Sequence, residues 1–432
     1  MNSLWQRLRG ELRTDLMFAL IMMAATTFGF AKVILMAWVL PEADFGFYIS
    51  GLGVATFLGI VLSFGRIEAT TKIYSILVLQ GSRAELLEHI GTLSKVLFRR
   101  TIIAGAVAAG GISLYPPQNL WGFGGAEIAL IFALGGVLAL LALLASVLRA
   151  LAHLRLLQAF TIARGFFVLL IAVPLATVFP WRIVLLSEGV ALLVVTALFW
   201  RFVLRCISAL RSDTNAARSV AGGDVDQARA EAGGRVIFWA NLCAAILPYG
   251  GRVLVLALAG PVVAGAFGLI TTLVQVGVML AGALAQKLGP NVIKVVHTQG
   301  GVAVLMQLIT LPVFLMASLS ILAFVAFTTS LFIPVFASFW AGYGITAPML
   351  GLVALHLFLP SYLFLQFGLI AIDREVDLLW AAVLAVATFA VGNAVCIFFG
   401  FGLFGYMITF FLADFARSLY GSFAIWRMKS QT

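Results

Sequence analysis

The sequence alternates long apolar stretches with short breaks that are polar or contain Gly and Pro, and this pattern constrains the fold more than any other feature. A helix needs about 20 apolar residues to cross a bilayer. Hydrophobic residues make up 63% of the 432 residues and charged residues only 10%, so a water-soluble fold would lack polar groups to cover its surface. We therefore predict a membrane protein with many spans. The composition excludes a soluble enzyme, a disordered chain and a secreted disulfide scaffold.

Backbone hydrogen bonding in lipid selects helices over strands for these spans. Open strands would leave backbone groups unpaired, and the strands of a closed barrel alternate polar with apolar residues, which these stretches do not. We predict an all-α polytopic membrane protein with twelve transmembrane helices in two six-helix bundles. The predicted spans are residues 16–40, 45–65, 96–115, 126–148, 160–180, 183–203, 236–259, 262–287, 302–327, 345–371, 376–399 and 403–426.

The basic residues indicate the orientation of the spans, because cytoplasmic loops carry an excess of Lys and Arg. With the N-terminus in the cytoplasm, all but four of the 27 Lys and Arg residues fall in cytoplasmic segments, including Arg164 at the start of the fifth span. The four others are Arg182, in an external segment, and Lys32, Arg252 and Arg417, within spans. We therefore predict that both termini are cytoplasmic. Loop anchoring also explains the net charge of +10 without nucleic-acid binding.

A polar stretch in the middle of the chain suggests a boundary between two halves. Residues 204–235 are rich in Gly, Ala and charged residues, and they lie on the predicted cytoplasmic side. We predict an N-terminal six-helix bundle over 1–203, a cytoplasmic linker over 204–235 and a C-terminal six-helix bundle over 236–432.

The two halves carry similar sequences at equivalent places. Residues 31–48 read AKVILMAWVLPEADFGFY, and residues 251–267 read GRVLVLALAGPVVAGAF. Six spans per half is an even number, so the halves share their orientation, as in transporters with a parallel pseudo-twofold repeat. A chance match between two apolar hairpins is the alternative. The aligned pairs are Lys32 with Arg252, Pro41 with Pro261 and, after a one-residue gap, Gly46 with Gly265.

Motifs in both halves resemble those of a known family. They are the run from Leu40 to Tyr48 (LPEADFGFY), Ser63-Phe64-Gly65, Ala69-Thr70-Thr71-Lys72, Gly260-Pro261 and the run from Ala285 to Pro290 (AQKLGP). In these motifs the chain resembles the bacterial polysaccharide flippases of the O-antigen (Wzx) type. That family belongs to the multidrug/oligosaccharidyl-lipid/polysaccharide exporter superfamily. The resemblance covers roughly residues 15–90 and 235–295.

This resemblance implies a fold, a substrate and a location. Members of the family have two six-helix bundles around a central cavity. The implied function is alternating-access movement of an undecaprenyl-diphosphate-linked oligosaccharide across the bacterial inner membrane, for lipopolysaccharide O-antigen or exopolysaccharide biosynthesis. An ion gradient or the membrane potential would drive this movement. The implied partners are the lipid-linked substrate, a polysaccharide polymerase and other assembly proteins.

Basic residues inside or next to the spans are candidates for binding the diphosphate. A cation in the membrane interior costs at least about 2.5–3.5 kcal/mol and usually faces water or a partner. No acidic residue lies within one helical turn of Lys32 or Arg252. We expect both to face the implied cavity, with snorkelling to the outer head groups as the alternative. Arg66 and Lys72, at the inner end of the second span, are candidates for the first contact with substrate, with cytoplasmic anchoring as the alternative.

Acidic residues within the spans are candidates for ion pairing or for coupling to an ion. Asp414 and Arg417 are three residues apart and can pair on one helix face, and a cation-coupling site at Asp414 is the alternative. Glu188 is expected to pair with Arg182 near the outer end of its span. His356 is one of several polar residues expected to line the cavity or to hydrogen-bond between helices.

A Pro–Gly segment next to Arg252 predicts a bend in the seventh span. Pro248 removes a helical hydrogen bond, and Gly250 and Gly251 loosen the turn that follows. We predict a hinge there that moves Arg252 between inward and outward states, with a static kink as the alternative.

The sequence also narrows the class of function. It contains no Walker motif, and its three cysteines form no metal-ligand pattern, so we expect a non-enzyme with no catalytic residue, cofactor or metal. Two alternatives to a flippase remain. An ion-coupled small-molecule antiporter of the multidrug type should carry acidic residues in its cavity. A membrane polysaccharide polymerase or glycosyltransferase usually needs a large external loop or an acid-rich face.

Overall fold

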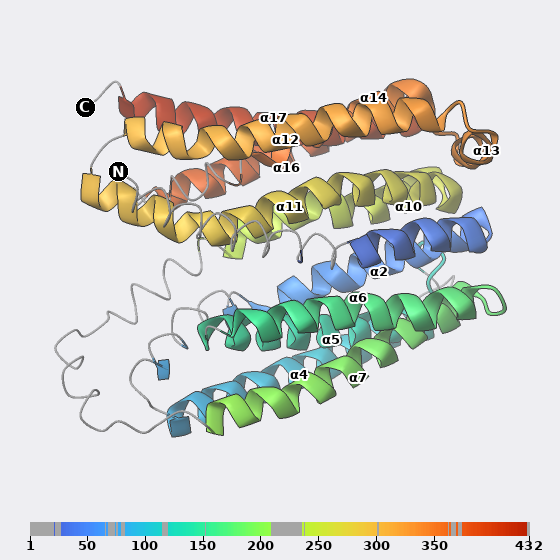
Figure 1. The fold of residues 1–432 in the computed structure, drawn as a ribbon. Helices are drawn as coiled ribbons and strands as arrows, with labels where there is room; N and C mark the ends of the chain where they lie inside the picture. The colour runs from blue at the N-terminus through green and yellow to red at the C-terminus, as the bar shows by residue number, and fades with distance from the viewer. Residues whose placement is uncertain are drawn as a thin grey trace, which may run out of the picture. The chain divides into compact units, whose positions relative to one another are not determined.

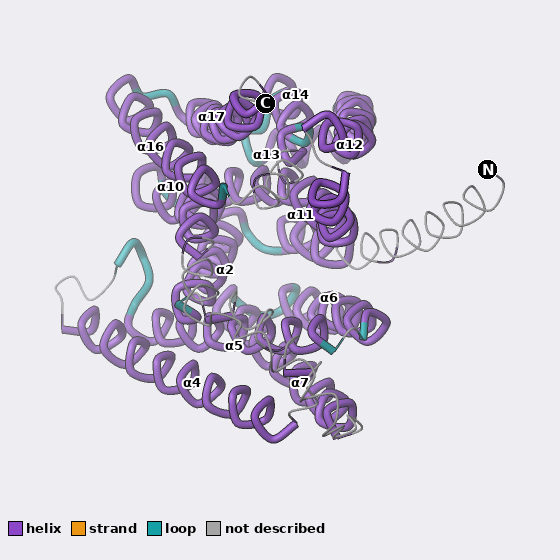
Figure 2. The backbone as a smooth tube through the Cα atoms, turned by 90° about the vertical axis from the view of Figure 1, so that its left-hand side faces the viewer, coloured by secondary structure: helices purple, strands orange, loops and turns teal. Residues whose placement is uncertain are grey.

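The computed structural model describes residues 21, 27–64, 66–67, 74, 77–78, 83–114, 120–151, 153–208, 236, 238–299, 302–361, 363, 369 and 374–429. Figure 2 shows that these residues form helices joined by short loops. Within the described ranges, β-structure is limited to an isolated bridge between Leu120 and Phe123. The prediction of an all-α fold is confirmed.

Many of the described helices are long and apolar enough to cross a membrane. Among the described residues there are nine, or ten if a bent pair of shorter helices is counted as one span. The shorter helix Thr27–Val39 lies within the first predicted span. The charged helix α17 (Gly402–Lys429) covers the last predicted span. The chain is thus a multi-pass membrane protein, and the count of twelve helices stays a prediction.

The chain divides into two compact units, which we name unit 1 (Met1–Trp38 and Ala266–Thr432) and unit 2 (Val39–Gly265). Residues 238–265, which the sequence analysis assigned to the C-terminal bundle, cluster with helices of the first half. The linker predicted at 204–235 lies largely outside the described residues, so the domain boundaries stay a prediction.

Unit 2 is organised around a central apolar helix, α5. This helix packs against α2, α4 and α7, and α6 packs against α7 (Figure 1). A helix that is apolar on all sides is expected to be surrounded by other helices or by lipid. The elements of unit 2 are α2 (Glu42–Ser63), α4 (Arg83–Leu114), α5 (Gly125–Ala150), α6 (Leu154–Ala176), α7 (Trp181–Ser208), a π-helical turn η1 (Ile246–Gly250) and α10 (Gly251–Ala259).

Unit 1 is built from long helices and one broken segment. The strongest packing is between α16 and α17, and α14 packs against both α12 and α17 (Figure 1). Helix α13 is bent by 89° from α14 and occupies a stretch that the sequence analysis left between two spans. The elements of unit 1 are the helix Thr27–Val39, α11 (Pro261–Gln299, which begins within unit 2), α12 (Val302–Ser330), α13 (Pro334–Gly342), α14 (Ala347–His356), a 3₁₀ turn η2 (Leu359–Ser361), α16 (Glu375–Phe399) and α17.

The sequence repeat coincides with equivalent helix starts. Pro41 precedes the first residue of α2, and Pro261 is the first residue of α11, as expected for proline at a helix start. The aligned glycines Gly46 and Gly265 meet each other within unit 2. A Cβ atom added to Gly46 would lie 1.8 Å from the carbonyl oxygen of Pro261, and one added to Gly265 would lie 3.3 Å from the Cα of Gly46. Two equivalent positions of the repeat therefore form one close helix crossing, in which Gly46 leaves no room for a side chain.

Candidate functional site

Arg252, in unit 2, is enclosed by protein inside an apolar span. It is the second residue of α10, and only 3% of its surface is exposed. A Cβ atom on Gly53 of α2 would lie 3.2 Å from the Cδ of Arg252, so the absence of a side chain at Gly53 makes room for the arginine stem. The guanidinium lies 5.7 Å from the ring centroid of Tyr249, within the range of a cation–π contact. Arg252 therefore does not point into the lipid chains.

The backbone before Arg252 departs from a regular α-helix where the sequence predicts a bend. Residues 246–250 form a π-helical turn that contains Pro248 and ends at Gly250. A proline has no N–H to donate, and single π turns inside α-helices are frequently found at functional sites. Regular α-helix resumes at Gly251. The irregular turn thus sets the direction of the segment that carries Arg252, while its movement stays a prediction.

Glu188 of α7 lies in the interior of unit 2 and accepts a hydrogen bond from Tyr48 of α2. The phenol oxygen is 2.6 Å from Oε2 of Glu188, and both residues are buried. The expected pairing of Glu188 with Arg182 is wrong, because the Arg182 guanidinium lies 2.7 Å from Glu127 instead. Spacing along α7 suggested the wrong partner because the actual partners of the two residues come from α2 and α5, which are distant in sequence.

Arg164, predicted to lie at the cytoplasmic end of a span, lies within helix α6. Helix α6 begins at Leu154, several residues earlier than predicted, so Arg164 lies well inside the helix. Its charge interacts with Glu188 and with Tyr249. The polar residues around His153 mark an earlier helix start, and they could have indicated that Arg164 lies within the helix. Unit 2 thus connects three buried residues, Tyr48, Glu188 and Arg252, with the half-buried residues Arg164 and Tyr249.

Lys32, the repeat-equivalent of Arg252, belongs to unit 1. It lies in the helix Thr27–Val39 with 6% of its surface exposed, so protein rather than lipid surrounds it. Of the two residues expected to receive the substrate first, Arg66 is exposed, and Lys72 lies outside the described residues. The charge of Arg66 acts on Arg100, whose Nη1 donates to the carbonyl oxygen of Leu62 at the end of α2.

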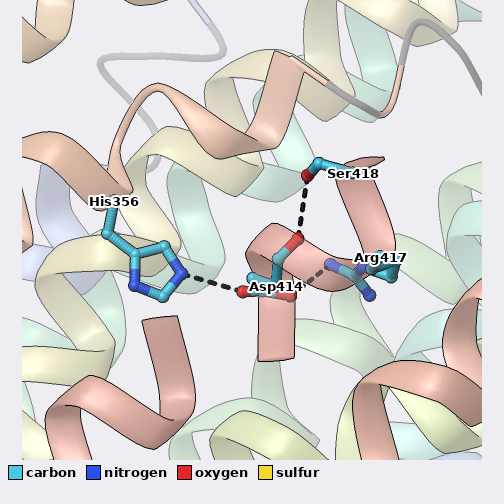
Figure 3. A network of polar contacts seen from close by, with 4 residues as sticks. All are labelled: His356, Asp414, Arg417 and Ser418. Carbon is cyan, nitrogen blue, oxygen red and sulfur yellow. Dashed lines mark hydrogen bonds and ion pairs between the residues drawn. The ribbon is translucent and has the colours of Figure 1, made fainter. Parts of the chain in front are cut away.

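Unit 1 contains a buried charged triad, shown in Figure 3. The ion pair expected between Asp414 and Arg417 is present, with 2.8 Å between Oδ1 and Nη2. His356, the last residue of α14, places its Nε2 2.9 Å from the other carboxylate oxygen, Oδ2. Ser418 donates to the main-chain carbonyl of Asp414 and leaves the carboxylate to the other two. Within the part of the chain that the structure describes, no cluster of His, Cys, Asp and Glu is suited to a metal ion.

The comparisons with known proteins identify the fold. No protein-family model matches the sequence, and no curated protein matches it. Among solved structures, an inward-facing multidrug resistance MATE transporter of the MOP superfamily has a TM-score of 0.65 at 14% identity, over 96% of this chain and 99% of that one. A MOP superfamily transporter from Pyrococcus furiosus, described as having a binding pocket of reverse polarity, has a TM-score of 0.63 at 12% identity, over 96% of both chains.

A flippase shares the same architecture. The lipid II flippase MurJ, in an inward closed conformation, has a TM-score of 0.62 at 13% identity, over 95% of this chain and 87% of that one. The chain therefore has the fold of these solved structures and is a polytopic, all-α membrane protein. The similar solved structures are transporters and flippases, not enzymes.

Proposed function

We propose that this protein moves a lipid with an anionic, diphosphate-linked oligosaccharide head group across the bilayer by alternating access. The observation that carries the proposal is Arg252, a cation buried in protein within an apolar span. Keeping a charge at that depth is costly, so it is retained where it serves a function. A diphosphate is the matching ligand, because guanidinium groups donate paired hydrogen bonds to phosphate oxygens.

Each unit holds a further cation within one of its helices. Unit 1 holds Lys32 within a span, and unit 2 holds Arg164 in addition to Arg252. Diphosphate and sugar groups cannot cross hydrocarbon unaided, because unpaired charges and hydroxyls are expensive to bury. The similarity of the sequence motifs to O-antigen-type flippases agrees with this substrate class. The same resemblance suggests the bacterial inner membrane as the location and a polysaccharide polymerase as a partner.

A second candidate is an antiporter of small organic cations, favoured by the buried carboxylates Glu188 and Asp414. These carboxylates already have partners inside the protein. Glu188 accepts from Tyr48, and the two oxygens of Asp414 contact His356 and Arg417. An organic cation would have to displace those partners. The anionic lipid is therefore the better-supported substrate.

Reconstitution of the purified protein into liposomes separates the two functions. One assay follows the transbilayer movement of a fluorescent polyprenyl-diphosphate-linked oligosaccharide, and a parallel assay follows uptake of ethidium as the organic cation. We expect movement of the lipid above the rate of protein-free liposomes and no uptake of ethidium. Uptake of ethidium without lipid movement would reject the flippase and support the antiporter.

The irregular turn at Pro248 is proposed to act as a hinge between transport states. Replacing Pro248 by Ala supplies the missing N–H and favours a continuous α-helix, so we expect slower lipid movement without loss of folded protein. The measurement is the initial rate of movement per folded protein in the same liposomes. Wild-type rates in Pro248→Ala would show that the turn is a static kink.

A further inference from the structure

Three arginines of unit 2 gather where α2 ends. Arg100 of α4 donates from Nη1 to the carbonyl oxygen of Leu62 at 2.9 Å, so a cation occupies the negative end of the α2 dipole. Its guanidinium also lies 5.3 Å from the ring centroid of Phe64, the residue that follows α2. The charges of Arg66 and Arg99 act on Arg100. We name Arg66, Arg99 and Arg100 the arginine cluster.

Phe64 fixes the position of the arginine cluster at the end of α2. It adopts the left-handed conformation, with φ 48° and ψ 44°, which is uncommon for a bulky residue. Its ring stacks on Phe238 with 5.8 Å between centroids and carries the Arg100 guanidinium on a cation–π contact. The residue is nevertheless 59% exposed. The cluster is therefore a built part of the fold that remains open to the outside of the protein.

No acidic side chain balances the arginine cluster within the part of unit 2 that the structure describes. None of the ion pairs found among the described residues includes any of the three arginines. Glu88 of α4 lies about three helical turns before Arg99. The acidic residues of α2 and α5 are in the first turns of those helices. Like charges gathered in this way repel one another, and a bound anion would remove the repulsion.

The lengths of the helices place the arginine cluster at the membrane boundary. Helix α2 has 22 residues and is therefore about 33 Å long. This length matches the hydrocarbon thickness of a bilayer, which is about 30 Å. Arg100 binds the last turn of α2, and the residues of α4 that follow it, from Thr101 to Leu114, include no charged side chain. Head-group phosphates are therefore expected at the level of the cluster.

An exposed apolar strip continues from the arginine cluster along α4. Arg99, Ile103 and Val107 are spaced four residues apart, so their side chains lie on one face of the helix. Arg99 is exposed, and the exposed fractions of Ile103 and Val107 are 56% and 70%. Helix α4 packs mainly against α5, which covers a different face. The strip thus presents cations at the head-group level and apolar side chains at the level of the acyl chains.

We propose that the arginine cluster binds the phosphate of a resident anionic phospholipid whose acyl chains lie along Ile103 and Val107. Guanidinium groups donate paired hydrogen bonds to phosphate oxygens, and basic pockets between helices at a membrane boundary bind anionic head groups. The bound lipid joins α4 to the end of α2. The strip lies on the outside of α4, so the ligand of Arg66 is a lipid of the surrounding membrane, not the transported one.

The first test measures lipid binding to the purified protein in detergent by native mass spectrometry. The probe is phosphatidylglycerol, and the reference is phosphatidylcholine, which has a phosphate but no net charge. We expect the wild type to prefer phosphatidylglycerol. The double variant Arg66→Gln/Arg99→Gln keeps Arg100 on α2, and it should bind phosphatidylglycerol more weakly by about fivefold for each arginine removed, the contribution of one basic residue near an anionic surface.

The control for this test is Arg205→Gln, which removes an exposed guanidinium in the last turn of α7 and should bind like the wild type. Both side chains replaced in the double variant are exposed, so we expect its melting temperature without lipid to stay unchanged. Equal affinity of the double variant and the wild type for phosphatidylglycerol would overturn the proposal.

The second test locates the lipid. A photo-crosslinking amino acid replaces Ile103, and a matched protein carries it in place of Leu193, an exposed apolar residue of α7. We expect crosslinks from position 103 to favour phosphatidylglycerol over phosphatidylcholine and to lose this preference in Arg66→Gln/Arg99→Gln. Position 193 should show no preference in either background. The absence of a preference at position 103 would overturn the proposal.

A competition experiment separates the resident lipid from the transported one. Polyprenyl diphosphate is added to the wild type with the crosslinker at position 103 and phosphatidylglycerol bound. We expect the phosphatidylglycerol crosslink to persist. Its loss at a low ratio of polyprenyl diphosphate to phosphatidylglycerol would assign the arginine cluster to the transported lipid and reject the resident one.

Discussion

Lipid movement is expected to fall by roughly 10²–10⁴-fold when Lys32 and Arg252 are both replaced by Gln. A hydrogen bond to a charged group contributes about 1.5–3 kcal/mol, so losing one such contact with the substrate at each residue removes roughly 3–6 kcal/mol, and 1.36 kcal/mol corresponds to a factor of ten in rate. The single variant Arg252→Gln should lose about half of this energy. Arg252→Lys should recover part of the rate, because it keeps the charge but not the paired donors.

The controls for this prediction come from the chain itself. Arg205→Gln removes an exposed guanidinium in the last turn of α7 and should leave the rate unchanged. Folded protein is measured by size-exclusion chromatography and thermal melting in detergent, so that a loss of rate can be assigned to substrate binding. A folded double variant that moves lipid at the wild-type rate would remove the buried cations from the mechanism and with them the main support for an anionic substrate.

Replacing Gly46 by Ala is expected to abolish most of the folded protein. The added Cβ would meet the Pro261 carbonyl at 1.8 Å, and a backbone group at a helix start cannot move away as the end of a side chain can. Overpacking usually costs about 1–3 kcal/mol and occasionally more, and we expect this variant at or beyond the upper end. The measurements are the yield of monodisperse protein and its melting temperature.

A graded series tests whether the close helix crossing is the cause. The Cβ of Gly265→Ala would lie 3.3 Å from the Cα of Gly46, a contact that small shifts can relieve. This variant should therefore lose less folded protein than Gly46→Ala. Gly110→Ala in α4 has no neighbouring atom within 4 Å and should be neutral or slightly stabilising, since alanine favours the helix. Equal stability of all three variants would mean that α2 and α11 are not held together at this crossing.

Hydropathy alone was sufficient to predict the class and most helix positions. The described spans overlap the predicted ones. An apolar stretch long enough to cross the bilayer must pair its own backbone groups there, and an α-helix does this. The Pro starts of α2 and α11 and the irregular turn at Pro248 also follow from local chemistry, since proline acts through its own ring and missing N–H. Helix α13 was missed, because a nine-residue apolar helix gives no span-length signal.

Side-chain partners could not be read from the sequence in the same way. The pair Asp414–Arg417 was predictable because both residues lie on one helix turn. The partners Tyr48 for Glu188 and His356 for Asp414 come from helices distant in sequence, and apolar spans have no pattern that ranks such contacts. Arg164 lies further inside its helix than predicted, because α6 begins at Leu154 and not near residue 160.

The sequence by itself determined that this chain is an all-α, multi-pass membrane protein with cations at two equivalent places of a repeat. These properties depend on composition and spacing, which hydrophobic burial and helix geometry translate directly into structure. The tertiary structure alone decided which buried charges meet, where α14 breaks and that Gly46 and Gly265 touch. Such contacts depend on how whole helices pack, and packing depends on shape across the helix surfaces rather than on the order of residues along the chain.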